Sequence, residues 1–161
     1  MSSLVIYDSK TGNTQKIAEK IAEGLNCKAY PYQEIPSILF YDLLVFGGWL
    51  KKGFIRTNFY QFIKDLLNKE LEGKKAALFL TCTFPTKKDK ISGNTYLDQT
   101  FSELEKLLQK KNCQVYPKKF HAIGAAKLFK WGKGFIKRGY PTTDSLEKAR
   151  QYGITLKNDF L

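Results

Sequence analysis

Apolar and polar residues follow one another along the chain in blocks that predict strands and helices in alternation. Short apolar runs predict five strands, at residues 4–7, 28–32, 43–48, 76–82 and 115–123. Apolar residues at helical spacing predict four helices, at residues 14–25, 58–67, 95–110 and 145–157. The third and fourth strands are continuously apolar, which is typical of central parallel strands covered on both faces. The alternation predicts one α/β domain, residues 1–161, built on a parallel sheet.

The place of a ligand site follows from where parallel strands end. In such sheets a ligand binds outside the carboxyl ends of the strands, at a topological switch point. The loops after the first, third and fourth strands, residues 8–14, 47–57 and 81–94, are therefore expected to converge. The last helix is expected to begin with a capping box at residues 144–147.

The first of these loops has the composition of a phosphate-binding site. It joins a buried strand to an amphipathic helix and consists of Ser9, Lys10, Thr11, Gly12, Asn13 and Thr14. N–H groups at a helix N-terminus favour an anion, and hydroxyl side chains add further donors. Neither G-x-x-x-x-G-K-[ST] nor G-x-G-x-x-G is present, so the loop predicts neither a P-loop nor a Rossmann dinucleotide site. The alternative is a surface turn in which Thr14 only caps the helix.

The loop after the third strand carries aromatic side chains that suit a planar cofactor. Its three glycines predict a flexible loop, and Gly48 and Trp49 lie at its start. Trp49 is the first candidate to stack on an aromatic ring and Phe54 the second. The alternative for Trp49 is a place at the edge of the core.

The loop after the fourth strand offers polar groups and a further ring. Thr81 and Thr83 are candidates to bond the polar edge of a planar cofactor through backbone amides and hydroxyls. Phe84 is a candidate to cover the other face of that ring. Cys82 lies between the two threonines, and its thiol is interpreted as a small buried group at a strand end.

Composition limits the classes of protein to which the chain can belong. Of its 161 residues 43% are hydrophobic, which excludes overall disorder, and no apolar run approaches the ~20 residues of a membrane span. The N-terminus has no signal-peptide pattern. Three cysteines without a C-x-x-C pattern fit reduced thiols in the cytoplasm, and a single histidine makes a metal site improbable. The net charge of +12 favours anionic partners.

One segment near the C-terminus is markedly basic. Residues 114–143 contain no Asp or Glu, and aromatic residues are interspersed among their basic ones. Glycines indicate a mobile loop, and the candidate contact residues are Lys127, Lys130, Trp131, Lys133, Lys137 and Arg138. Such a surface suits an anionic substrate, an acidic reductase or peripheral contact with a membrane. Binding of nucleic acid is not favoured, because the first loop already indicates a different ligand. The structural alternative is a solvated loop without a binding role.

Over nearly its whole length the chain resembles the flavodoxin family. The resemblance rests on the loop Ser9–Thr14, the aromatic residues after the third strand, the five-strand alternation and the closing run Gly139-Tyr140-Pro141. It implies a doubly wound, five-stranded parallel sheet of order 2-1-3-4-5 and one non-covalent FMN, held by the residues named above. Three features depart from typical flavodoxins: the positive charge, the absence of an acid at residues 81–85, and a long basic segment at 124–143.

These observations favour an FMN-dependent electron-transfer protein that meets an acidic redox partner. The alternative is an enzyme of the flavodoxin-like protoporphyrinogen oxidase or quinone reductase type, acting on an anionic aromatic substrate. A basic binding module without flavin is the third hypothesis. The resemblance favours a carrier over an enzyme with its own substrate.

Overall fold

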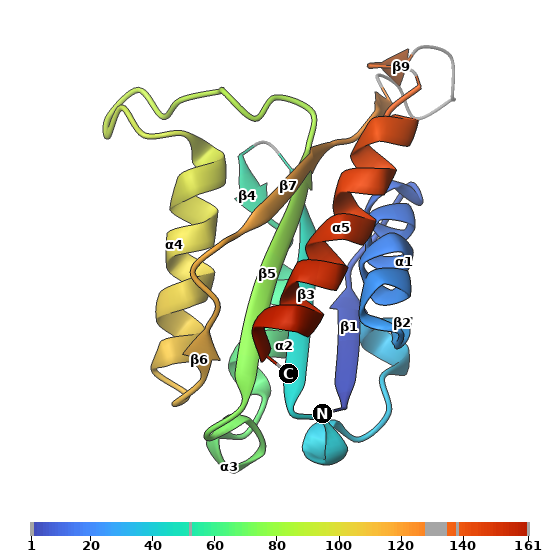
Figure 1. Ribbon diagram of the computed structural model, residues 1–161. Helices are drawn as coiled ribbons and strands as arrows, with labels where there is room; N and C mark the ends of the chain where they lie inside the picture. The colour runs from blue at the N-terminus through green and yellow to red at the C-terminus, as the bar shows by residue number, and fades with distance from the viewer. Residues whose placement is uncertain (1, 52, 128–134, 138, 161) are drawn as a thin grey trace.

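Strands and helices alternate along the chain and assemble around a central sheet (Figure 1). The computed structural model describes residues 2–51, 53–127, 135–137 and 139–160. The parallel strands of its main sheet are β1 (Ser3–Tyr7), β2 (Lys28–Pro31), β3 (Leu43–Lys51), β5 (Lys75–Cys82), β6 (Gln114–Val115) and β7 (Phe120–Ile123). They are ordered β2-β1-β3-β5, and β6 and β7 both pair with β5. The short strand β4 (Phe54–Ile55) pairs antiparallel with the end of β3.

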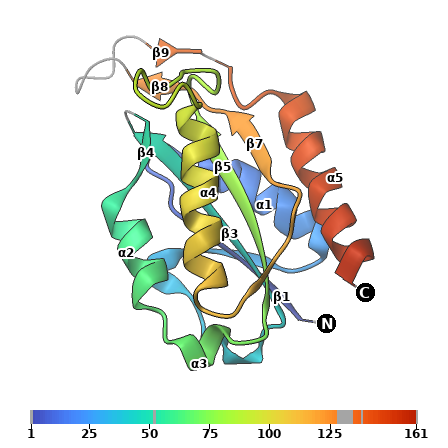
Figure 2. The same ribbon diagram turned by 90° about the vertical axis from the view of Figure 1, so that its left-hand side faces the viewer.

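Helices cover both faces of this sheet (Figure 2). One face carries α1 (Asn13–Leu25) and α5 (Thr143–Phe160), and the other carries α2 (Thr57–Asp65) and α4 (Tyr96–Gln109). The connections contain α3 (Asn68–Leu71) and the 3₁₀ turns η1 (Tyr32–Glu34) and η2 (Ile38–Phe40). Within the described residues, no helix is both long enough and apolar enough to cross a membrane.

The side chains of each central strand alternate between two cores. In β1, Leu4 and Ile6 pack toward α2 and α4, whereas Val5 packs toward α1 and α5. In β5, Leu78 and Phe79 divide in the same way. Because both faces are buried, these strands have few polar positions, which is why they appear as continuous apolar runs in the sequence.

The predicted sheet order 2-1-3-4-5 is confirmed, with β5 in the fourth place and β6 and β7 in the fifth. The predicted fifth strand, however, is two strands. Tyr116 still donates its N–H to the carbonyl of Ala76 at 2.7 Å. Pro117 has no N–H with which to continue the ladder, and pairing resumes at Phe120.

The last helix begins before the predicted capping box. The Thr142 hydroxyl accepts a hydrogen bond from the Ser145 N–H at 3.2 Å, and α5 begins at Thr143. Asp144 therefore lies in the first turn, and the predicted capping box at 144–147 is wrong. Thr142 caps α5 because it directly precedes the helix, so its hydroxyl can accept a hydrogen bond from an N–H group of the first turn.

Candidate functional site

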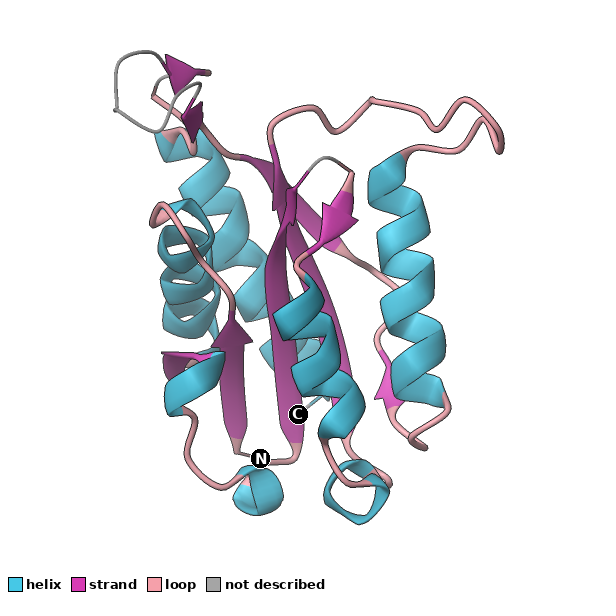
Figure 3. Ribbon diagram, turned by 180° about the vertical axis from the view of Figure 1, so that it is seen from behind, coloured by secondary structure: helices cyan, strands magenta, loops and turns pink. Residues whose placement is uncertain are grey.

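The carboxyl ends of β1, β3 and β5 meet at one end of the sheet, together with the loops that follow them (Figure 3). Gly12 precedes α1 with a φ of 86°, a left-handed conformation that glycine adopts readily, and its N–H donates to Ser9 Oγ at 3.1 Å. Within the described part of the chain, no acceptor bonds the N–H groups of Asn13, Thr14 and Gln15. These three groups are free to bind an anion, and the dipole of α1 favours one there.

The side chains of this loop fix it to neighbouring elements. Asn13 Nδ2 donates to Thr11 Oγ1 at 3.2 Å and, at 2.8 Å, to the backbone carbonyl two residues after β7. The buried hydroxyls of Thr14 and Thr81 share a hydrogen bond of 2.7 Å, which joins the start of α1 to the end of β5. Both hydroxyls are thus bonded inside the protein, whereas Lys10 and Thr11 are exposed on the loop.

The segment after the predicted third strand is a β-hairpin, so the prediction of a loop without strands there is wrong. Gly47 and Gly48 lie inside β3, which turns at Gly53 and returns as β4. A Cβ on Gly47 would lie 1.8 Å from the Phe79 ring, and one on Gly48 would lie 2.9 Å from Ile55. These glycines therefore make room for neighbouring side chains.

A buried acid that the sequence analysis missed lies next to this hairpin. Asp8 follows β1 and is only 2% exposed, and its Oδ1 lies 3.2 Å from Arg56 Nη1. Burial raises the pKa of Asp8, while the Arg56 charge and the nearby Trp49 indole N–H oppose that rise. The indole does not complete a hydrogen bond: among the described residues, neither Asp8 Oδ2 nor Trp49 Nε1 has a partner. The one feature of the sequence that could have indicated this buried acid is the position of Asp8 directly after an apolar strand.

Aromatic rings on two other segments lie open to solvent at the same end of the sheet. Phe54 of β4 is 62% exposed, and its ring centre lies 5.8 Å from that of Tyr96 in α4. Phe84, two residues after β5, is 53% exposed, and Lys137 Nζ lies 5.5 Å from its ring centre. Thr83 is half-buried beside it. The structure thus gathers the candidate ring contacts from both predicted loops at one end of the fold.

Cys82 is the last residue of β5 and is buried. Burial raises the pKa of its thiol to about 11, although Lys137 opposes this rise. The thiol is therefore protonated at neutral pH, and its burial agrees with its interpretation as a small structural residue rather than a nucleophile.

Comparison with known proteins defines the family. A family described as flavodoxin domain matches residues 4–125. The chain belongs to the flavodoxin family. An uncharacterized protein of Methanocaldococcus jannaschii is 31% identical over 98% of this chain and 100% of its own length. A flavodoxin of Aquifex aeolicus is 33% identical over 47% of each chain.

Solved structures share the fold. A flavodoxin from the domain Archaea matches with a TM-score of 0.72 at 16% identity, covering 99% of this chain and 98% of that one. Flavodoxin 1 of Bacillus cereus matches with a TM-score of 0.67 at 19% identity, covering 100% and 99%. The flavodoxin resemblance drawn from the sequence is confirmed.

Two short parts of the basic segment of this flavodoxin-family protein are paired strands. Strand β8 (Ala126–Lys127) pairs antiparallel with β9 (Phe135–Ile136), so the predicted mobile loop has paired ends. Lys137 follows β9 with a φ of 56° and lies 6.0 Å from the ring centre of Tyr140. The other predicted contact residues fall outside what the structure describes: the whole of Lys130, Trp131, Lys133 and Arg138, and the side chain of Lys127.

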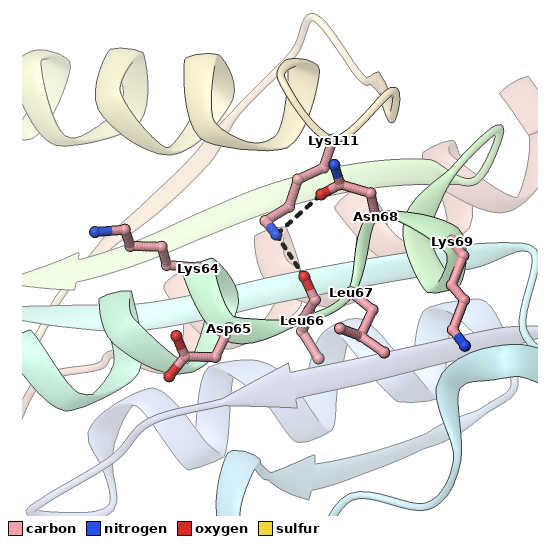
Figure 4. Close-up of a pocket in the computed structure, with 7 residues that line it drawn as sticks. All are labelled: Lys64, Asp65, Leu66, Leu67, Asn68, Lys69 and Lys111. Carbon is pink, nitrogen blue, oxygen red and sulfur yellow. Dashed lines mark hydrogen bonds between the residues drawn. The ribbon is translucent and has the colours of Figure 1, made fainter.

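A surface groove of a different character lies beside α3, at the opposite end of the sheet (Figures 1 and 4). Its lining residues are Lys64, Asp65, Leu66, Leu67, Asn68, Lys69 and Lys111. Lys111 Nζ donates to the Leu66 carbonyl, at the end of α2, and to Asn68 Oδ1 at 3.4 Å. Lys111 therefore has a structural role, because it satisfies the C-terminus of α2.

Proposed function

We propose that this protein binds FMN and transfers electrons in the cytoplasm. The observation that carries the proposal is the set of free backbone N–H groups at the start of α1, directly after a strand and a hydroxyl-bearing loop. A terminal phosphate suits that site because it is a compact anion with several acceptor oxygens. Family membership supports the proposal, and the free cysteines suit a reducing compartment.

The residues at the site would divide the binding of FMN among them. The loop Ser9–Thr14 would hold the phosphate, and Trp49 and Phe84 would contact the two faces of the ring. The polar edge would meet the backbone at Thr81 and Thr83, because the Thr81 hydroxyl is already bonded to Thr14. FMN supplies the one- and two-electron chemistry when bound, and the protein orients it and sets its potential.

An enzyme acting on an anionic aromatic substrate is the second candidate. Lys137 favours it, because this side chain lies near both Phe84 and Tyr140 and so offers a cation among aromatic rings. Steady-state turnover with quinones or carboxylated tetrapyrroles separates the two candidates. A carrier is reduced and reoxidised by partner proteins without turning over these compounds.

An FMN titration compared with a riboflavin titration tests the phosphate site. FMN should bind at least about tenfold more tightly, because charged hydrogen bonds contribute about 1.5–3 kcal/mol each. Thr11→Ala should weaken FMN binding by about 1 kcal/mol and leave riboflavin binding unchanged. Thr155→Ala on α5 is the matched control, and it should change neither affinity. Equal affinities for FMN and riboflavin would contradict the assignment of the loop.

A further inference from the structure

Aromatic rings and lysines alternate along the surface around the proposed ring site. Three segments contribute: the β3–β4 hairpin, the loop after β5 with the start of α4, and the residues after β9. Lys87 Nζ lies 5.8 Å from the Tyr96 ring centre, and Lys137 Nζ lies near Phe84. We call this surface the aromatic–lysine rim; it consists of Phe54, Phe84, Lys87, Tyr96, Lys137 and Tyr140.

The acids beside the rim are engaged within their own segments. Asp89 accepts a hydrogen bond from the Ser92 N–H at 2.9 Å, and Asp98 accepts one from the Thr95 hydroxyl at 2.6 Å. Asp89 is the sole acid at residues 83–95, a stretch that also contains Lys87, Lys88 and Lys90, and residues 47–57 contain no acid. Lysines dominate the charge that faces solvent here.

The exposure of the apolar residues indicates a protein rather than a small molecule as the occupant. Phe54 on β4 is more than half exposed, and Ile91 in the loop after β5 is 96% exposed. A small aromatic ligand is usually enclosed in a concave pocket, whereas these side chains project from the surface. Exposed apolar residues surrounded by charge are typical of a docking surface.

We propose that the aromatic–lysine rim is the docking surface for an acidic electron-transfer protein. The lysines attract the partner and orient it by charge complementarity. The exposed Phe54 then buries apolar surface against it, next to the proposed ring site. This inference rests on the proposed electron-transfer function, because it assigns the partner of the same site.

Binding of an acidic [2Fe–2S] ferredoxin to the flavin-free protein tests the rim separately from the flavin. Amide chemical shifts report where the probe binds, and a salt series reports the charge dependence. Lys87→Glu combined with Lys88→Glu should weaken binding about tenfold and reduce its salt dependence. Lys69→Glu combined with Lys110→Glu, at the opposite end of the molecule, changes net charge equally and should have less than a twofold effect.

Phe54→Ser should weaken binding while leaving the salt dependence unchanged, because it removes apolar contact and no charge. Equal losses in the two charge variants, shift changes away from the rim, or no binding of the probe would each overturn the proposal. Absorbance after FMN addition is recorded on the same samples. Failure of docking with intact FMN binding would therefore refute the rim alone, and failure of FMN binding would refute the proposed function.

Discussion

Removing the Arg56 guanidinium should reveal the cost of burying Asp8. In Arg56→Met the apolar stem stays, but the carboxylate loses the charge 3.2 Å away and is left with neither oxygen bonded. Leaving a buried polar group without its partner costs about 1–3 kcal/mol. The Arg56 side chain is 33% exposed, so solvent screens part of the interaction and the lower half of that range is expected. For a domain of this size we expect a fall in Tm of about 2–8 °C.

The loss should depend on pH in a direction that the pKa of Asp8 determines. Burial raises this pKa in the folded state, and removal of Arg56 raises it further. Because the pKa of Asp8 is raised by folding, its contribution to stability is fully present below its pKa in the unfolded chain, about 4. That contribution is lost as the pH rises through its pKa in the folded protein. Arg56→Met should therefore be destabilised most at neutral pH and recover toward acid pH.

Urea unfolding of the flavin-free protein, followed by circular dichroism at pH 7 and pH 4, measures both effects. Asp8→Asn removes the charge, so Arg56→Met should cost little in that background. Lys148→Met, which breaks the exposed pair with Asp144, is the control and should cost no more than about 0.5 kcal/mol. A deficit that is the same at both pH values, or the same in the Asp8→Asn background, would refute the argument.

Two further predictions concern packing and the proposed ring contact. Gly153→Ala should lower the unfolding free energy by about 1–3 kcal/mol, although alanine has the better helix propensity, because a Cβ there would lie 2.2 Å from the Ile21 carbonyl oxygen. Urea unfolding measures this loss. An unchanged unfolding midpoint would contradict the close contact of α1 and α5. Trp49 fluorescence, measured in a Trp131→Phe variant, should be quenched by FMN and recover when FMN is removed; constant emission would return Trp49 to the core interpretation.

The regular part of the fold was predictable because its signals are local. The apolar runs of β1, β3 and β5 and the helical spacing of α1 and α4 depend on residues close together in the chain. The loop Ser9–Thr14 was predictable for the same reason, since the strand, the loop and the helix start are consecutive. What these signals specify is the set of elements and the end of the sheet at which the loops after β1, β3 and β5 converge.

The errors arose where distant residues decide the structure. Gly47 and Gly48 suggested a loop, but the Phe79 ring on the neighbouring strand and Ile55 on the returning strand require small residues there. The Asp8–Arg56 pair joins the end of β1 to the start of α2, and no periodicity in the sequence connects these positions. Such pairings become visible only when the strands are placed side by side.

The separation between backbone and side-chain roles explains how a flavodoxin fold accommodates a charge of +12. The proposed phosphate contacts are N–H groups at the start of α1, and any sequence that forms the same turn presents them. Lys10, Lys87 and Lys88 lie exposed on the loops at this end of the sheet, where their charge is not needed to form that turn. Surface charge can therefore change sign without disturbing the proposed cofactor site. Under the two proposals made above, the fold determines where FMN binds, and the exposed side chains around that site select the partner by their charge.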